Sequence, residues 1–143
     1  MCGIAGFIGK VDNSVLKLTK MVHSIHHRGP DDHGIWLDEV PGMGLAHARL
    51  SVLDLSPAGH QPMHSDSGRF VMVFNGEIYN HHAIREELES AGGASWRGRS
   101  DTETLLAAIE CWGLEATLKK TRGMFAIALW DKTAKTLSLA RDR

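Results

Sequence analysis

Runs of apolar residues recur along this chain, and each predicts a β-strand. The run at residues 69–74 is almost wholly apolar, as expected of a strand that is covered on both faces. The run at residues 3–9 contains Gly3, Gly6 and Gly9, and glycine inside a strand often marks the close approach of another backbone or of a ligand. The predicted strands are residues 3–9, 34–40, 43–50, 69–74, 124–130 and 136–140.

Apolar residues at helical spacing predict amphipathic helices in the segments between strands. Val15, Leu18 and Val22 share one helical face after a turn-forming Asp-Asn-Ser cluster. The clearest helix start is at Ser100, because Ser100 and Glu103 fit a capping box. The predicted helices run from the cluster at residues 12–14 to about residues 26–27, over residues 82–91, from residue 100 to residue 113, and, as a short segment, over residues 114–121.

Turn-forming residues join several of the strands into hairpins. Asn75-Gly76 is the dipeptide that most favours a tight two-residue turn, so the pattern predicts that the strand at residues 69–74 ends there. Residues 131–135 predict a longer hairpin loop, and residues 56–68 a loop rich in Pro, Gly, His and Ser. With about six strands in hairpins and three or four helices, the pattern predicts an α+β fold and not alternating β-α-β units.

Composition and charge exclude several classes of protein. The 143 residues suit one domain, and 16 basic residues balance 17 acidic ones, so neither nucleic acid nor a membrane surface is an expected partner. No apolar run reaches the roughly 18–20 residues of a transmembrane helix, and no export signal precedes the first strand. Cys2 and Cys111 are far apart, and the histidines lack the spacing of a zinc site. We therefore expect a cytoplasmic protein with reduced cysteines and no metal.

Cys2 directly follows the initiator methionine, and this position gives it distinctive chemistry. If Met1 is removed, Cys2 carries a thiol with a pKa of about 8.5 beside a free α-amine with a pKa of about 7.7–8.0. Such an amine can take the thiol proton, directly or through water, without a histidine or aspartate partner. The alternative is that Cys2 is an ordinary residue near the start of the chain.

Five polar or small residues could supply the partners that such a thiol needs for hydrolysis of an amino-acid amide. The Asn75 side chain and the Gly76 N–H could form an oxyanion hole. Arg49 matches an α-carboxylate by bidentate pairing, and Glu77 and Asp101 match an α-ammonium group. Taken singly, each has an ordinary structural explanation: a surface arginine, a hairpin turn and a helix-start residue.

Six blocks of the sequence occur in the order of one known family: residues 1–6 (MCGIAG), 27–34 (HRGPDDHG), 46–54 (AHARLSVLD), 59–63 (GHQPM), 74–80 (FNGEIYN) and 100–103 (SDTE). Together they resemble the glutaminase domain of glutamine-hydrolysing asparagine synthetases. That domain is a class II glutamine amidotransferase of the N-terminal nucleophile (Ntn) hydrolase superfamily. Relatives that serve glucosamine-phosphate or phosphoribosylamine synthesis share the opening Cys-Gly but lack the Arg-Leu-Ser block, so the asparagine synthetase branch fits best.

The resemblance implies a fold and a role for each candidate residue. The fold is a four-layer αββα sandwich of two antiparallel sheets. Cys2 is the nucleophile, and Asn75 and Gly76 form the oxyanion hole. Glu77 and Asp101 bind the α-ammonium group of glutamine. Arg49 holds the α-carboxylate, and the pocket is lined by the segment of Arg49, Leu50, Ser51, Val52 and Leu53.

The resemblance also implies partners beyond L-glutamine. The family domain continues past Arg143 and is followed by a synthetase domain that binds ATP and Mg. We therefore expect residues 1–143 to form an incomplete class II glutamine amidotransferase domain that is truncated at its C-terminal end and has no cofactor of its own. A sheet that lacks its last strands exposes an edge, which favours association, so a homodimer is a further candidate.

Three hypotheses for function are open at this point. In the first, the chain is the glutaminase half of an enzyme that amidates aspartate at the expense of ATP. In the second, it is a non-catalytic fragment that only binds glutamine or dimerises. In the third, it is a glutaminase half that serves another acceptor, such as a sugar or a peptide-like carboxylate.

Overall fold

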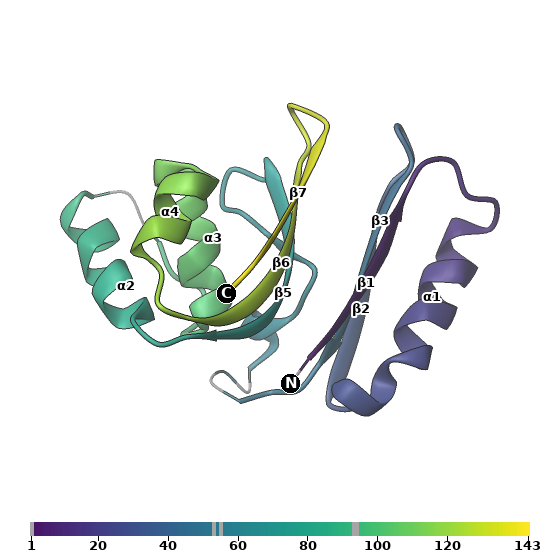
Figure 1. The fold of residues 1–143 in the computed structure, drawn as a ribbon, viewed down its shortest axis with the longest axis horizontal. Helices are drawn as coiled ribbons and strands as arrows, with labels where there is room; N and C mark the ends of the chain where they lie inside the picture. The colour runs from purple at the N-terminus through teal and green to yellow at the C-terminus, as the bar shows by residue number, and fades with distance from the viewer. Residues whose placement is uncertain (1, 53, 55, 93–94) are drawn as a thin grey trace.

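The computed structural model describes residues 2–52, 54, 56–92 and 95–143, and these form four layers (Figure 1). The first sheet has the strand order β1 (Gly3–Ile8), β3 (Met43–Arg49) and β2 (Asp32–Asp38). The second sheet has the order β4 (Met63–His64), β5 (Phe70–Ile78), β6 (Gly123–Asp131) and β7 (Thr136–Arg141). All the pairings between these strands are antiparallel.

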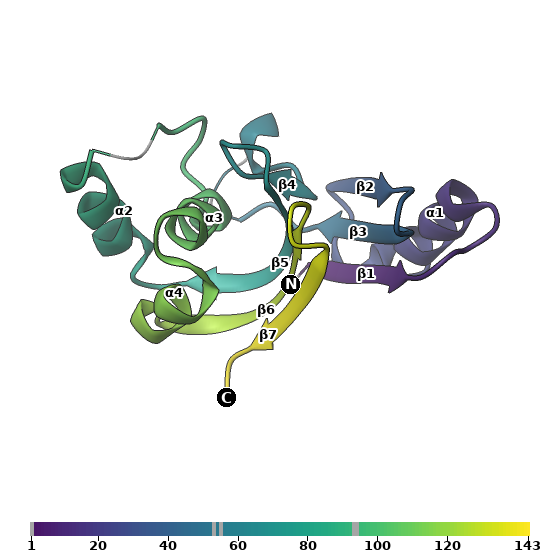
Figure 2. The ribbon, with the colours of Figure 1, turned by 90° about the horizontal axis from the view of Figure 1, so that it is seen from above.

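Helices cover the outer face of each sheet, as the view from above also shows (Figure 2). Helix α1 (Ser14–Ser24) lies on the first sheet, and a short 3₁₀ turn at His26–Arg28 follows it. The second sheet is covered by α2 (His81–Ser90), α3 (Asp101–Trp112) and α4 (Leu114–Lys120). The predicted αββα sandwich of two antiparallel sheets is therefore confirmed.

Strand β3 is buried on both faces. Its successive side chains point to opposite faces of the sheet, so they pack in two different cores. Ala46 and Ala48 pack with α1. Met43 and Leu45 point the other way and pack with the apolar residues of the second sheet. His47 and Arg49 continue this second row, so alternation places two polar side chains between the sheets.

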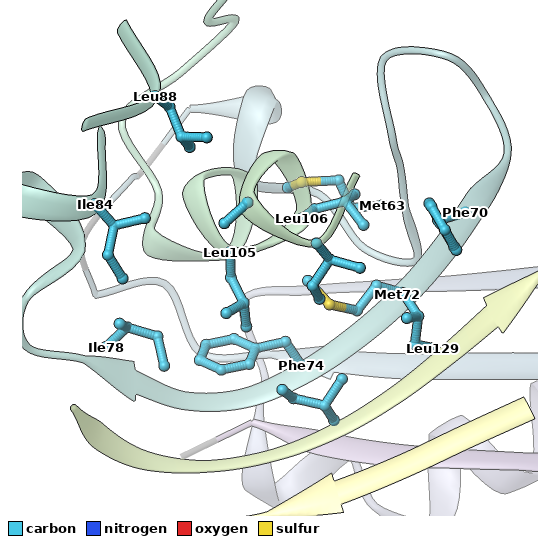
Figure 3. Packing of buried hydrophobic residues seen from close by; sticks show 13 residues of the cluster. Met63, Phe70, Met72, Phe74, Ile78, Ile84, Leu88, Leu105, Leu106 and Leu129 are labelled. Atoms are coloured by element: carbon cyan, nitrogen blue, oxygen red, sulfur yellow. The ribbon is translucent and has the colours of Figure 1, made fainter. Parts of the chain in front are cut away.

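The largest core cluster lies between the second sheet and its helices (Figure 3). Phe74 and Ile78 of β5 face Leu105 of α3, which is 1% exposed. Helix α3 begins where the sequence predicts, because the Ser100 hydroxyl accepts a hydrogen bond from the Glu103 N–H at 3.2 Å. Only this half of the capping box forms, since the Glu103 carboxylate binds N–H groups in the preceding loop.

Asn75-Gly76 does not form the predicted tight turn. Both residues lie inside β5, opposite Ala126 and Phe125 of β6. The turn prediction is wrong because the backbone of β6 continues the ladder past this point as far as Ile78. Glycine is required at position 76 for another reason: a Cβ atom there would overlap the carbonyl oxygen of Met124.

One smaller feature also differs from the sequence analysis. The two-residue strand β4 lies in the segment predicted to be a loop, where it pairs with Met72 and Val71 of β5. Because β4 is so short, it leaves most of that edge of β5 without a partner strand.

Among the helices of the described residues, none is both long and apolar enough to cross a membrane.

The packing predicts a contrast between two leucines. Replacing Leu105 by Ala should lower the free energy of unfolding by about 2–5 kcal/mol, because it opens a cavity in the largest core cluster. The same replacement at Leu139, which is 72% exposed on β7, should change it by less than about 0.5 kcal/mol. Urea denaturation measures both, and equal losses would contradict this assignment of the core.

Candidate active site

A cavity of about 130 Å³ lies where the start of β1 meets the end of β3 and the last part of β5. Leu53 lies outside the described residues, and Ser51 and Asn75 are not among the described residues that line this cavity. The structure nevertheless brings most of the predicted site residues together. Those that line the cavity are Cys2, Arg49, Leu50, Val52, Gly76, Glu77 and Asp101.

The Cys2 sulfur is held at the end of the β1–β3 ladder. Gly3 pairs with Ala48, so Cys2 lies beside the last residues of β3. The Leu50 N–H donates a hydrogen bond to Sγ at 3.3 Å. The same sulfur lies 3.6 Å from the Leu50 carbonyl oxygen, so the thiol can both accept from and donate to the Leu50 backbone.

The segment at residues 28–32 holds the two chain segments that carry the candidate nucleophile and Arg49. The Arg28 Nε donates to the Cys2 carbonyl oxygen at 3.1 Å. The Asp31 carboxylate accepts a hydrogen bond from the Ser51 N–H at 2.7 Å, and the Asp31 N–H donates to the Arg49 carbonyl. The sequence analysis assigned no role to Arg28 or Asp31, although both belong to one of its six blocks.

Arg49 is 8% exposed and is oriented by the loop that follows β3. Its guanidinium donates hydrogen bonds to the carbonyl oxygens of Ser56, at 3.1 Å, and Asp54. Gly59 packs against the same group so closely that a Cβ atom there would overlap Nη2. The cation is therefore fixed by neutral acceptors and carries its charge into a cavity where an anion can bind.

Three carboxyl groups line the same cavity as Arg49: Asp54, Glu77 and Asp101. Asp101 is 5% exposed, and it accepts hydrogen bonds from the N–H groups of Ile78 at 2.9 Å and Thr102 at 2.8 Å. Burial raises the pKa of Asp101, and the nearby Glu77 carboxylate raises it further. One cation and three acidic groups in one small cavity provide sites for both charges of a free amino acid.

The edge of β5 that β4 leaves open provides a backbone donor. In an antiparallel ladder, the N–H groups of alternate residues point to the same edge. The Phe74 N–H donates to Gln61 Oε1 at 2.7 Å, and the Ile78 N–H donates to Asp101. The Gly76 N–H lies between them on this edge, and no side chain of the described residues accepts a hydrogen bond from it.

The Asn75 side chain points away from the open edge of β5, on which the Gly76 N–H lies. Alternation along β5 turns its side chain towards the first sheet, on the same face as Val71 and Val73. Its Oδ1 atom is buried and has no hydrogen-bond partner among the described residues. Its predicted role as a second oxyanion donor stays a prediction.

The cavity also contains residues that the sequence analysis did not single out. They include Gln61, whose Nε2 lies 3.4 Å from the Thr102 hydroxyl, and Asp54. The Asp54 carboxylate accepts hydrogen bonds from the Arg99 and Ser56 N–H groups, which lower its pKa. Within the part of the chain that the structure describes, no three His, Cys, Asp or Glu side chains are grouped to hold a metal ion.

Comparison with known proteins places this arrangement in a family. Residues 1–143 match the family model described as "Glutamine amidotransferase domain". The chain is 41% identical over 148 residues to asparagine synthetase [glutamine-hydrolyzing] 1 of Bacillus subtilis, covering 99% of this chain and 22% of the relative. It is 37% identical over 155 residues to amidase chry2 of Gibberella zeae, covering 100% of this chain and 23% of the relative.

A solved structure shows the same fold. It is the glutamine phosphoribosylpyrophosphate (PRPP) amidotransferase from B. subtilis complexed with ADP and GMP, with a TM-score of 0.72 and 20% identity over 99% of this chain and 36% of the other. The chain thus spans only 22–23% of the length of the two curated relatives above. Because the family model covers the whole chain, the chain belongs to the glutamine amidotransferase domain family.

Proposed function

We propose that this chain hydrolyses the side-chain amide of L-glutamine to L-glutamate and ammonia, with Cys2 as the nucleophile. The observation that carries the proposal is that Cys2, Arg49, Asp101 and Gly76 line one cavity. They come from four different elements or loops, and each matches a different part of the substrate. Membership of the glutamine amidotransferase domain family supports the choice of glutamine.

The charged residues orient the substrate in this proposal. The Arg49 guanidinium binds the α-carboxylate, because its planar fork suits a carboxylate and its hydrogen bonds go to neutral carbonyl oxygens. Its charge also lowers the pKa of Asp32 and Asp54, but neither of these two described carboxylates forms an ion pair with it. Asp101 and Glu77 bind the α-ammonium group. With both charged groups of the α-carbon held, the side-chain amide at the other end of the molecule extends towards Cys2 and the open edge of β5.

The proposed reaction then proceeds through a thioester. With Met1 removed, the Cys2 α-amine takes the thiol proton, and the thiolate adds to the amide carbon. The Gly76 N–H and the Asn75 side chain stabilise the oxyanion. The intermediate collapses, the amine returns the proton to the leaving nitrogen, and ammonia departs. Water then cleaves the γ-glutamyl thioester, which releases glutamate and restores the thiol.

We further propose that residues 1–143 are the incomplete amidotransferase domain of a longer protein. A synthetase domain would use the ammonia to make asparagine, as the name of the B. subtilis relative suggests. We propose that this domain binds ATP and Mg and amidates aspartate. An acceptor other than aspartate is the second candidate, since the G. zeae relative is named an amidase and not an asparagine synthetase. Strand β7 is an edge strand of its sheet, so association of two copies there stays a prediction.

The proposal predicts that glutaminase activity depends on one of the two cysteines. Cys2→Ala should reduce glutamate release to background, because no nucleophile remains. Cys111→Ala, at the exposed cysteine, is the matched control and should keep the activity. Intact mass should show the loss of one methionine from active protein. In a longer protein that contains a synthetase domain, Cys2→Ala should spare synthesis from free ammonia, and loss of both activities would count against the assignment.

Gly59→Ala should weaken glutamine binding. The new methyl group displaces the Arg49 guanidinium, so the KM for glutamine should rise roughly tenfold or more, with a smaller change in kcat. Steady-state kinetics measures both constants, and the thermal unfolding midpoint shows whether the chain still folds. An unchanged KM in folded Gly59→Ala would argue against Arg49 as the carboxylate site.

The raised pKa of Asp101 predicts a specific dependence on pH. Binding of the α-ammonium group needs the ionised carboxylate, which is lost as the pH falls through its raised pKa. The value of kcat/KM should therefore decline on the acid side at a higher pH than an exposed aspartate would give. Asp101→Asn should lower kcat/KM at neutral pH and remove this decline. Profiles from about pH 4 to 7 compare the two proteins, and an identical acid limb in Asp101→Asn would refute the assignment.

A further inference from the structure

We propose that His47 and Gln61 are positioning residues that clamp Phe74 and so hold the Gly76 N–H in place as an oxyanion donor. The inference rests on the proposed function, because it assigns these two side chains a part in the same reaction. Neither side chain touches the reacting atoms. Both act through the backbone of β5.

Gln61 supplies one half of the clamp. It is 5% exposed, and its Oε1 accepts the Phe74 N–H at 2.7 Å. Its amide nitrogen faces the Thr102 hydroxyl at 3.4 Å. Gln61 thus connects the edge of β5 to the start of α3, where Asp101 is also located.

His47 supplies the other half from the opposite sheet. It is completely buried, and its Nε2 lies 3.0 Å from the Phe74 carbonyl oxygen. A carbonyl oxygen only accepts, so Nε2 carries the proton. Burial lowers the pKa of His47 to about 4, so the ring is neutral near pH 7 and Nδ1 is an unprotonated acceptor. Nδ1 has no partner among the described residues.

The clamp lies on the part of the β5 edge that has no neighbouring strand among the described residues. Pairing with β4 ends at Met72, so Phe74, Gly76 and Ile78 lie on an edge without a neighbouring strand. Gln61 accepts the Phe74 N–H, and His47 donates to the Phe74 carbonyl oxygen. Asp101 accepts the Ile78 N–H. The free N–H of Gly76 is therefore fixed from two residues before it and two residues after it.

A fixed donor matters more for the transition state than for substrate binding. An oxyanion donor contributes fully only when it already points at the place where the charge develops. Removal of such a donor typically lowers kcat about 10²–10³-fold, so loosening it should cost a part of that effect. Glutamine itself is held mainly through its α-carboxylate and α-ammonium groups, which the clamp does not touch.

The test uses paired variants of the chain and the kinetics of glutamate release. Gln61→Leu and His47→Leu each remove one bond to Phe74. We expect kcat to fall about tenfold or more in both, with less than about a threefold change in KM. Gln61→Glu keeps an oxygen acceptor, and His47→Gln keeps a nitrogen donor, so these two should recover most of the lost kcat.

Ser65→Ala is the matched control. The Ser65 hydroxyl accepts the Phe70 N–H at 3.2 Å, which is the same kind of bond to the same edge of β5, four residues before Phe74. Its removal should leave kcat within about twofold of the wild-type value. A loss of kcat in Ser65→Ala equal to that in Gln61→Leu would show a general effect of strand stability and would overturn the proposal.

A second probe separates positioning from folding. Glutamate γ-semialdehyde can add the Cys2 thiol across its C=O bond, so that a C–S bond forms and the proton passes to the oxygen. That oxygen then lies where the oxyanion would lie. Binding of this aldehyde should weaken in proportion to kcat across the variants. Unchanged aldehyde binding, or a rise in KM with kcat preserved, would overturn the proposal even if His47→Leu fails to fold.

Failure of the proposed glutaminase function can be distinguished from failure of the clamp. A folded wild-type chain with Met1 removed that releases no glutamate would contradict the glutaminase assignment. The clamp is then judged by NMR, through amide hydrogen exchange of Phe74 and the amide resonance of Gly76. Faster exchange with a displaced Gly76 resonance in Gln61→Leu, but not in Ser65→Ala, supports it. No change at either amide refutes it.

Discussion

The face-to-face packing of two antiparallel sheets decides where each polar group of the site can lie. Inward-facing positions of β3 and β5 must either fill the apolar core or find hydrogen-bond partners, because an unpaired polar group between the sheets is costly. Met43 and Leu45 meet the first requirement at one end of β3. His47 and Arg49 meet the second at the other end, where the cavity opens.

The buried polar residues around the cavity are held largely by backbone groups. Arg49 donates to two carbonyl oxygens, Asp101 accepts two N–H groups, and Gln61 accepts one. Such contacts fix the direction of each side chain without neutralising the charge of Arg49 or Asp101. The charges therefore remain available for a zwitterionic ligand, and the raised pKa of Asp101 is a cost of keeping that carboxyl buried.

Two of the three exceptions to this pairing among the described residues lie close to the proposed chemistry, and the third is His81 Nδ1 at the start of α2. The Asn75 Oδ1 and the His47 Nδ1 are buried atoms without partners in the described part of the chain, on the facing sides of the two sheets. Buried unpaired groups are uncommon and often mark functional sites. Their position next to the open edge of β5 fits a region that is arranged for a reaction as well as for stability.

The sequence by itself determined the order of most elements, the class of fold and most of the predicted residues that line the cavity. The capping serine at position 100 and the helical spacing of Val15, Leu18 and Val22 are local signals, and they identified helices that the structure contains. Only the tertiary structure decided that Asn75-Gly76 continues a strand, because the partner that holds it there, β6, lies about fifty residues further along the chain. The roles of Arg28, Asp31, His47 and Gln61 also depend on such distant contacts. Their partners are mainly backbone atoms, whose positions no pattern of neighbouring side chains specifies.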